Sequence, residues 1–377
     1  MIVACILVFA LYSFSILLLI YGFKKLPYFT KEDTQPKTQF SVVIPFRNEA
    51  ENLPELLNSL KKLKYPSELF EIIFINDDSE DDSEAIIIEG MKNFEFSYQL
   101  IQNLRKSNSP KKDAITEAIR QSKNSWILTT DADCHVPETW LSCFDGFIQK
   151  QKAVFVAGPV QYVSNGSYIE NFQLLDGLSL QAVTLGSFGL GQPILCNGAN
   201  LAYRKDVFEK VNGFSGNDHL ASGDDIFLLE KMKRAFPKKV RFLKSREAII
   251  LTKPQKTWKA VLNQRIRWAS KTSKQKNVFS LFLGILVFVI NILMLIIPFI
   301  TIFQPELLKY YVLFIVLKII VDYILLSVSA RFFRKKLFFT LLLTTTYVYA
   351  LLITLVIAKS ISSSYQWKGR THENSLK

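Results

Sequence analysis

Long uncharged stretches occur near both ends of the chain. Residues 1–23 carry no charged side chain, and comparable uncharged runs cover residues 278–303 and 337–358. A helix of about 20 apolar residues is long enough to cross a bilayer, so each run predicts a membrane span. The first run is too long for a signal-peptide core and lacks a small-residue cleavage site. We therefore expect a retained N-terminal anchor.

A fourth apolar stretch, residues 310–330, contains two charged side chains. Lys318 and Asp322 are four residues apart, so on a helix they share a face and can neutralise each other. One interpretation is an ion pair turned toward neighbouring helices. The other is a polar lining of a lipid or sugar path, because ionisable side chains inside membranes are often functional. With this stretch, the sequence predicts about four transmembrane helices.

From residue 39 onward the pattern changes to short apolar runs alternating with helical periodicity. Buried strands are predicted at Phe40–Phe46, Glu71–Asp77 and Trp126–Asp133, with helices at 48–63 and 112–122 between them. This alternation predicts an α/β fold with a doubly wound, mostly parallel sheet. Ligands bind beyond the carboxyl ends of such strands. Because each strand here ends in polar residues, we expect the three ends to line one crevice.

Two further segments show helical patterns. Residues 168–190 are mostly apolar and predict an interfacial or core helix leading into a glycine-rich loop with Gly186, Gly189 and Gly191. Residues 257–276 place apolar side chains on one face and polar ones on the other. This second pattern is typical of an amphipathic surface helix or of an interfacial helix lying on a membrane. The apolar face comprises Trp258, Val261, Leu262, Ile266 and Ala269; the polar face comprises Gln264, Arg267, Trp268 and Lys271.

Composition and charge narrow the class of protein. The 377 residues are 49% hydrophobic, which excludes disorder as the main state, and 46 Lys and Arg against 33 Asp and Glu give a net charge of +13. The basic residues gather beside the predicted spans, where anionic lipid headgroups explain them better than nucleic acid does, so no nucleic-acid partner is expected. Four cysteines without a C-x-x-C pair indicate neither a zinc cluster nor a disulfide framework.

The basic clusters also predict orientation and domain boundaries. By the positive-inside rule, residues 24–277 form a cytoplasmic domain between an anchor at 1–23 and a membrane region at 278–358 of the plasma (inner) membrane. The polar tail, residues 359–377, is also basic, although four spans would place it outside. The sequence leaves this conflict open.

Two acidic pairs carry candidate chemistry. Asp131 and Asp133 are two residues apart at a predicted strand end, so both carboxylates would point the same way and could bind one Mg²⁺ or Mn²⁺ together with a diphosphate. The alternative is a turn with a helix cap, and Asp224 and Asp225 could likewise cap a helix. Neither a G-x-G-x-x-G nor a G-x-x-x-x-G-K-[ST] motif is present, which argues against a dinucleotide fold and a P-loop.

A series of motifs in one order resembles membrane-bound glycosyltransferase family 2, with a GT-A fold and a Q-x-x-R-W element. The resemblance covers about residues 39–270. It rests on VVIPFRNEAENLPELLNSL from residue 42, EIIFINDDSEDDS from 71, WILTTDAD from 126, LCNGANLAYRKDVFEKVNGF from 195, SGDDIFLLEKM from 222 and NQRIRW from 263.

The resemblance implies roles for individual residues. Asp225 would be the catalytic base, with Asp224 beside it, and Asp131 and Asp133 would hold Mg²⁺ or Mn²⁺. The acceptor would meet Cys196, Asn197, Gly198 and Trp268. The nucleotide donor would contact Pro45, Arg47, Glu49, Asp77, Lys112, Asp131, Gln264, Arg267 and Trp268.

The activity that the resemblance implies is an inverting transfer of a sugar from a nucleotide-diphosphate sugar, with uridine as the expected base. The acceptor would be a lipid-linked or membrane-embedded molecule or a glycan, because the site is tethered beside membrane lipids. A processive polysaccharide synthase is one alternative, since such enzymes share the Q-x-x-R-W element. A non-catalytic membrane scaffold that keeps the fold is another.

Overall fold

The chain folds into two compact units in a computed structural model. The structure describes residues 2–31, 34–92, 94–217, 220, 222–272, 277–362, 365–367 and 370–372. The sheet unit comprises Pro27–Ser164 and Leu195–Pro254, and the helical unit comprises Met1–Leu26, Asn165–Ile194 and Gln255–Lys377. The division thus groups residues 165–194 and 255–277 with the apolar helices, although they lie inside the range that the sequence analysis assigned to one cytoplasmic domain.

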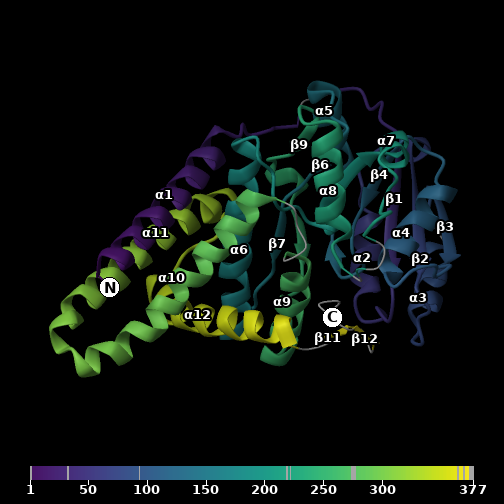
Figure 1. The fold of residues 1–377 in the computed structure, drawn as a ribbon. Helices are drawn as coiled ribbons and strands as arrows, with labels where there is room; N and C mark the ends of the chain where they lie inside the picture. The colour runs from purple at the N-terminus through teal and green to yellow at the C-terminus, as the bar shows by residue number, and fades with distance from the viewer. Residues whose placement is uncertain are drawn as a thin grey trace. The chain divides into compact units, whose positions relative to one another are not determined.

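The sheet unit is built on a seven-stranded sheet with strand order β3-β2-β1-β4-β8-β6-β9 (Figure 1). The strands β1, β2, β3 and β4 pair in parallel, whereas β8 runs antiparallel to both β4 and β6. The predicted mostly parallel α/β sheet is therefore confirmed. The strands are β1 (Phe40–Phe46), β2 (Phe70–Asn76), β3 (Ser97–Gln102), β4 (Trp126–Thr129), β6 (Phe155–Ala157), β8 (Leu201–Arg204) and β9 (Val240–Phe242).

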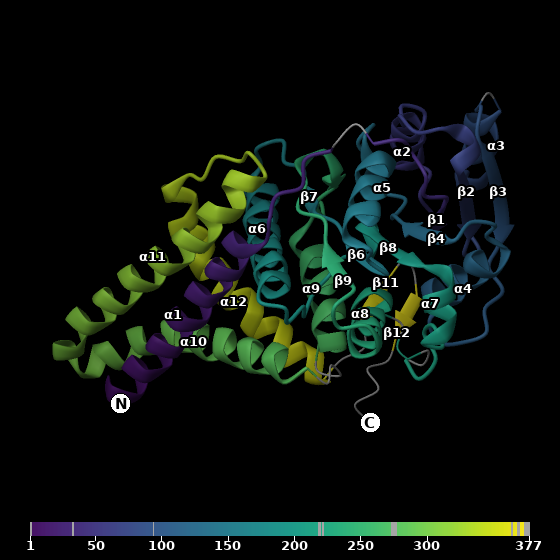
Figure 2. The same ribbon diagram turned by 90° about the horizontal axis from the view of Figure 1, so that it is seen from above.

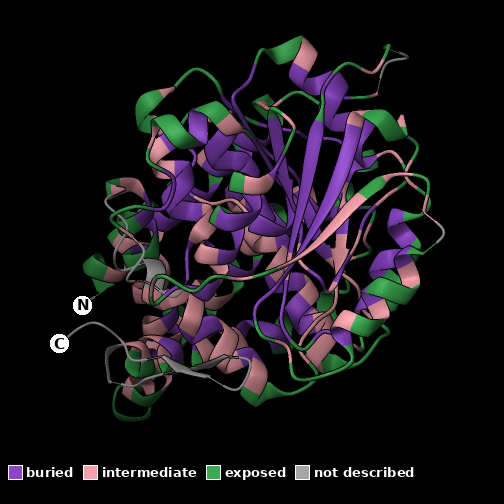
Figure 3. Cartoon of the chain, turned by 90° about the vertical axis from the view of Figure 1, so that its right-hand side faces the viewer, coloured by how far each residue is buried: buried purple, intermediate pink, exposed green. Residues whose placement is uncertain are grey.

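Helices cover this sheet, so its central strands are buried (Figure 3). Every residue of β2 is buried, and Val42, Ile44, Ile72 and Phe74 belong to one core cluster. Burial on both faces explains why these strands are continuous apolar runs. The helices are α2 (Leu53–Leu60), α3 (Ser83–Met91), α4 (Pro110–Gln121), α5 (Trp140–Gln151), α7 (Lys205–Lys210) and α8 (Asp224–Ala235), with short 3₁₀ turns η1 (Ser67–Leu69), η2 (Gly198–Asn200) and η3 (Arg246–Ala248).

A small second sheet in the same unit has strand order β5-β10-β7. Its strands are β5 (Cys134–His135), β7 (Val160–Tyr162) and β10 (Ile250–Thr252). Since β5 directly follows the turn after β4, the Asp131–Asp133 segment connects the main sheet to this second sheet.

The helical unit contains four helices that are long and apolar enough to cross a membrane (Figure 2). They coincide with the four predicted spans: α1 (Ile2–Lys25), α10 (Val278–Phe303), α11 (Leu308–Phe332) and α12 (Phe339–Ser362). The unit also contains α6 (Tyr168–Gly189), α9 (Trp258–Thr272), the 3₁₀ turn η4 (Pro305–Leu307) and the paired strands β11 (Tyr365–Trp367) and β12 (Arg370–His372).

The charged pair inside α11 joins a buried lysine to a partly buried aspartate. Lys318 is 2% exposed, and its ammonium lies 2.7 Å from the Asp322 carboxylate. Tyr12 of α1 donates a hydrogen bond of 2.5 Å to the other oxygen of Asp322. The structure therefore favours an ion pair turned toward neighbouring helices.

The helices α1 and α6 meet at glycines. A Cβ atom at Gly186 would lie 2.5 Å from the carbonyl oxygen of Leu19, and one at Gly189 would lie 1.8 Å from that of Gly22. The expected glycine-rich loop is thus wrong for Gly186 and Gly189, which lie in α6 itself. Small residues at these positions let two apolar helices approach backbone to backbone.

Candidate active site

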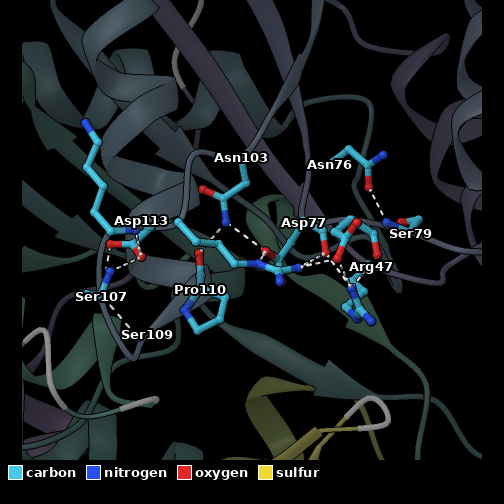
Figure 4. A network of polar contacts seen from close by, with 12 residues as sticks. Arg47, Asn76, Asp77, Ser79, Asn103, Ser107, Ser109, Pro110 and Asp113 are labelled. Atoms are coloured by element: carbon cyan, nitrogen blue, oxygen red, sulfur yellow. Dashed lines mark hydrogen bonds and ion pairs between the residues drawn. The ribbon is translucent and has the colours of Figure 1, made fainter.

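The end of strand β2 carries a buried acid held by two side chains from the segment after β3 (Figure 4). Asp77 is 5% exposed. Its Oδ1 atom accepts hydrogen bonds from Asn103 Nδ2 at 2.8 Å and from Arg105 Nε at 2.9 Å. One carboxylate at the carboxyl edge of the sheet is therefore fixed in orientation, as recognition of a polar ligand requires.

Arg47, at the end of β1, also reaches this place. Its guanidinium donates to the backbone carbonyl oxygen of Asp77 at 2.8 Å and forms an ion pair with Glu80 at 2.8 Å. Because Arg47 is 8% exposed, much of its side chain serves to hold the loop after β2. The structure thus brings Arg47 and Asp77 together, in line with the expectation that neighbouring strand ends converge.

The loops after β1 and β2 are locked to each other in an uncommon backbone conformation. Asn48 and Asp78 have positive φ angles of 51° and 64°. The backbone N–H of Asn48 donates to Ser79 Oγ at 3.1 Å, and the backbone N–H of Glu80 donates to Asn48 Oδ1 at 2.8 Å. Such conformations persist only where the surroundings over-determine them, and they cluster at functional sites.

Two other donor-side candidates lie close in the chain to these loops. Glu49 is 8% exposed, and its carboxylate accepts a hydrogen bond of 2.7 Å from Asn52 Nδ2. Pro45 is partly buried within β1, beside Ile75 of β2. Both therefore lie near the carboxyl end of β1, the strand next to β2.

A partly buried lysine contacts one acid of each acidic pair. Lys111 Nζ lies 2.6 Å from Asp131 Oδ1 and 3.6 Å from Asp224 Oδ2. Burial disfavours the charge on this ammonium, but Asp131, Asp224 and Asp225 outweigh burial and raise the pKa of Lys111 well above its usual range. A single cation therefore gathers carboxylates that are 93 residues apart in the chain, from 131 to 224.

Asp131 and Asp133 do not lie on a strand, contrary to the expectation. Strand β4 ends at Thr129, and a turn follows in which the backbone N–H of Cys134 donates to the Asp131 carbonyl at 3.2 Å. The alternation of side chains along a strand therefore does not decide where these two carboxylates point. Burial, with Asp133 and Asp131 nearby, raises the pKa of the Cys134 thiol well above its usual range.

The acids at the start of α8 follow a position whose left-handed backbone conformation favours glycine. Gly223 has a φ of 88°, and Asp224 and Asp225 form the first turn of the helix. Asp225 Oδ1 accepts a hydrogen bond of 2.8 Å from the backbone N–H of Ile226. A helix N-terminus favours nearby negative charge, so the first turn of α8 suits two acidic side chains.

The predicted acceptor loop touches these acids. A Cβ atom at Gly198 would lie 3.0 Å from Asp224 Oδ2 and 3.8 Å from Lys111 Nζ. The Gly198 carbonyl accepts a hydrogen bond of 2.6 Å from Thr129 Oγ1, and Asn197 Oδ1 accepts one of 3.0 Å from the Ala199 N–H. Cys196, the preceding residue, is partly buried. The loop after β4, the start of α8 and the segment 197–198 thus form one cluster.

Lys112, a predicted donor contact, has a different environment from its neighbour. It is 2% exposed, and its ammonium donates to the carbonyl oxygens of Asn217 at 2.6 Å and Leu220 at 2.8 Å. It therefore holds the segment that leads toward Asp224 and Asp225.

The carboxylates fit a hard divalent cation in donor chemistry. Within the described part of the chain, no group of three or more His, Cys, Asp or Glu side chains could hold a metal ion. Mg²⁺, however, is usually bound by one or two carboxylates together with substrate phosphates. The Asp131 carboxylate already accepts a cation, the Lys111 ammonium, so its environment tolerates positive charge.

The Q-x-x-R-W element lies on α9 in the helical unit. Gln264, Arg267 and Trp268 are partly exposed. Val261 and Ile266 of the predicted apolar face are buried, whereas Trp258 of that face is exposed. Ile266 packs with Val356 of α12. Lys271, also predicted on the polar face, has a side chain outside the described residues.

Three residues of the site escaped the sequence analysis: Lys111, Asn103 and Arg105. Lys111 precedes Lys112 at the start of a predicted helix, and the two lysines look equivalent in sequence. Only their different directions on α4 distinguish them. Asn103 and Arg105 follow β3, a strand that was not predicted, and no sequence signal marked them.

Residues 41–211 match the family model described as Glycosyl transferase family 2. This region of the chain belongs to glycosyl transferase family 2. Over 243 residues the chain is 26% identical to the probable glycosyltransferase YdaM of Bacillus subtilis, covering 63% of this chain and 56% of that protein. It is 25% identical over 241 residues to the poly-beta-1,6-N-acetyl-D-glucosamine synthase of Staphylococcus epidermidis, with the same coverage of 63% and 56%. The chain thus spans just over half the length of these curated relatives.

A solved structure shares the fold across nearly the whole chain. The mannosyltransferase PcManGT from Pyrobaculum calidifontis, solved in complex with GDP-Man and Mn²⁺, superposes with a TM-score of 0.55 at 16% identity. The match covers 95% of this chain and 96% of that protein. The GT-A type α/β fold with apolar helices is therefore confirmed.

Proposed function

We propose that this protein is an inverting glycosyltransferase that moves a sugar from a nucleotide-diphosphate sugar, with uridine as the base, to a lipid-linked or membrane-embedded acceptor. One observation carries the proposal: Asp131 of the strand-end turn and the Asp224–Asp225 pair of α8 gather around the ammonium of Lys111. Family 2 membership of residues 41–211 supports the reaction class.

The donor would bind along the edge that carries Pro45, Arg47, Glu49, Asp77 and Asp131. Asn103 and Arg105 donate hydrogen bonds to Oδ1 of Asp77. These contacts fix the whole carboxylate, so the direction of Oδ2 is fixed as well. Asp131 and Asp133 would hold Mg²⁺ or Mn²⁺, which when bound neutralises charge on the leaving diphosphate. Following the resemblance, Arg267 and Gln264 of the helical unit would contact the diphosphate, and Lys112 would support the donor side from α4.

The transfer step needs one base. The acceptor hydroxyl oxygen attacks the anomeric carbon, the bond from that carbon to the diphosphate oxygen breaks, and the nucleoside diphosphate leaves. Asp225 accepts the hydroxyl proton, a contribution worth roughly 10²–10⁴-fold in rate. Direct attack inverts the anomeric centre. Asp224, Gly198, Asn197, Cys196 and Trp268 would position the acceptor.

The four candidate spans support a membrane location. We propose a multi-pass protein of the plasma (inner) membrane with the catalytic sheet unit on the cytoplasmic side, where nucleotide sugars are made. An acceptor carried by a lipid would reach such a site by diffusion in the bilayer.

Purified protein with Mn²⁺ and a panel of nucleotide sugars tests the proposal. The wild type should transfer or slowly hydrolyse one donor, and Asp225→Asn should lose at least about 10²-fold in rate while still binding that donor in a thermal-shift assay. Full activity of Asp225→Asn would remove Asp225 from its role. Silence of the wild type with every donor would favour the scaffold alternative.

A processive polysaccharide synthase is a second candidate, favoured by the similarity to the poly-beta-1,6-N-acetyl-D-glucosamine synthase. Product length separates the two candidates. A single added sugar in a reconstituted assay supports the first, and a ladder of long products supports the second.

A further inference from the structure

Arg265, a residue of α9 to which the family resemblance assigns no role, is the centre of a buried polar contact. Its guanidinium carbon lies 4.2 Å from the centre of the Trp268 ring. Its NH1 group donates to Gln264 Oε1 at 2.8 Å, and its NH2 group forms an ion pair with the carboxylate of Asp176 on α6. One cation thus contacts both ends of the Q-x-x-R-W element and ties them to another helix.

The ion pair is buried, whereas the residues that it contacts on α9 are accessible. The side chains of Arg265 and Asp176 are 10% and 6% exposed, and Gln264 and Trp268 are partly exposed. A buried ion pair is weak evidence for stability, because desolvation offsets most of the attraction. It does fix geometry, because guanidinium is planar, stacks on aromatic rings and donates in fixed directions.

Both helices are already held by apolar contacts close to the pair. Ile266 of α9 packs with Val356 of α12, and Phe172 of α6 contacts the ring of Trp258 at 5.1 Å between centroids. Docking of α9 therefore does not depend on the ion pair alone. What the pair adds is the direction of the Trp268 ring and of the Gln264 amide.

We propose that Asp176 and Arg265 are positioning residues that orient Gln264 and Trp268 for the transfer reaction. Asp176 fixes the guanidinium, and the guanidinium fixes the indole plane and the amide. The inference rests on the proposed function insofar as Trp268 meets an acceptor. The geometric part, that Asp176 sets the environment of Trp268, stands independently of any activity.

The first experiment measures that geometry without turnover. The contribution of Trp268 to fluorescence is obtained by subtracting the emission of Trp268→Phe from that of the parent protein. In Asp176→Asn acrylamide should quench the Trp268 emission more strongly, because Arg265 without the Asp176 carboxylate no longer holds the indole ring in place. The matched control is Glu170→Gln, which removes one charge from the same helix, where the carboxylate accepts a hydrogen bond from the Asn165 N–H. Unchanged quenching of Trp268 in Asp176→Asn would overturn the inference.

The second experiment measures catalysis. Asp176→Asn should raise the acceptor KM and lower kcat/KM for the acceptor by up to about 100-fold, as small misplacements do. Donor affinity should fall by a smaller factor, because Gln264 is only one of the proposed donor contacts. Arg265→Lys keeps the charge but lacks the planar fork and should give an intermediate loss. An equal loss of donor affinity and acceptor kcat/KM would indicate general disruption and would overturn the positioning role.

The double variant Asp176→Leu with Arg265→Met covers the case in which a single change prevents folding. Replacing both partners of a buried ion pair by apolar side chains is often neutral for stability. We expect this variant to fold, with quenchable Trp268 and a raised acceptor KM. Wild-type quenching and KM in the double variant would overturn the inference. A wild type that is silent with every donor but whose Trp268 responds to Asp176→Asn would contradict only the proposed function.

Discussion

The ammonium of Lys111 lies 2.6 Å from Oδ1 of Asp131. This contact, extended to Asp224 at 3.6 Å, places a positive charge among three carboxylates that would otherwise repel one another. Lys111→Met should therefore separate the turn after β4 from the start of α8. Loss of one such electrostatic group costs about 10²–10³-fold in rate, and we expect a fall of that size in sugar transfer.

Two comparisons make the Lys111 prediction specific. Lys111→Arg keeps the charge and should retain more activity than Lys111→Met. Lys92→Met, at an exposed lysine paired with Glu89 on α3, should leave transfer unchanged. Equal activity of Lys111→Met and the wild type would show that the contact is incidental.

Gly198 should not tolerate a side chain, because a Cβ atom there would lie 3.0 Å from Asp224 Oδ2. Gly198→Ala should push Asp224 aside by a few tenths of an ångström. We expect kcat/KM to fall by about 10- to 100-fold, since catalytic groups are sensitive to small displacements. Steady-state kinetics with a donor-binding assay checks this: an undiminished rate would mean that Asp224 need not keep its place.

The α1–α6 contact predicts a second intolerant glycine. Gly186→Ala would place a Cβ atom 2.5 Å from the Leu19 carbonyl, so the helices must separate. Overpacking of this kind costs about 1–3 kcal/mol, and thermal unfolding in detergent should report it. Gly284→Ala in α10 is the matched control, because among the described residues no other segment comes within 4 Å of its added Cβ. A similar loss in both variants would refute the close-contact explanation.

Cysteine reactivity should depend on pH in a way that burial explains. Desolvation, aided by Glu247, raises the pKa of Cys143 to about 12. Only the thiolate reacts with iodoacetamide, so alkylation of Cys143 in the folded protein should be slow at neutral pH and should keep rising with pH toward 12. In denaturant the pKa returns to about 8.5, and the rate should level off above that pH. Site-resolved mass spectrometry, with the partly buried Cys196 as the internal reference, follows both states. Rapid labelling of native Cys143 at pH 7 would contradict its burial.

Much of the architecture was predictable from local pattern. Strand β1 was predicted at its observed bounds, and the four apolar stretches became α1, α10, α11 and α12. Apolar runs of strand or bilayer length leave few alternatives, because burial of continuous apolar surface dominates the free energy. The ion pair of Lys318 and Asp322 was predictable for the same reason, since a spacing of four residues is itself a geometric relation on a helix.

The site was predictable only in part. The acids at residues 77, 131, 133, 224 and 225 stand out because motifs in one order mark them. Lys111 and Arg105 do not stand out in the sequence, because basic residues are common on protein surfaces. No neighbouring residue in the sequence shows which basic side chain will face an acid. The strand assignment of Asp131 and Asp133 was wrong because β4 ends two residues earlier, where the chain turns into the second sheet.

The sequence alone determined the strands β1 and β2 and the four apolar helices, and it marked the acids proposed for the chemistry, since each follows from periodicity or a motif within a few residues. Tertiary structure alone decided that Lys111 joins Asp131 to Asp224, that Arg265 links Trp268 to Asp176, and that Gly186 serves helix packing. These are contacts between residues tens of positions apart. Their partners are selected by how helices and strands pack, and that packing is set by side-chain shape and charge in three dimensions.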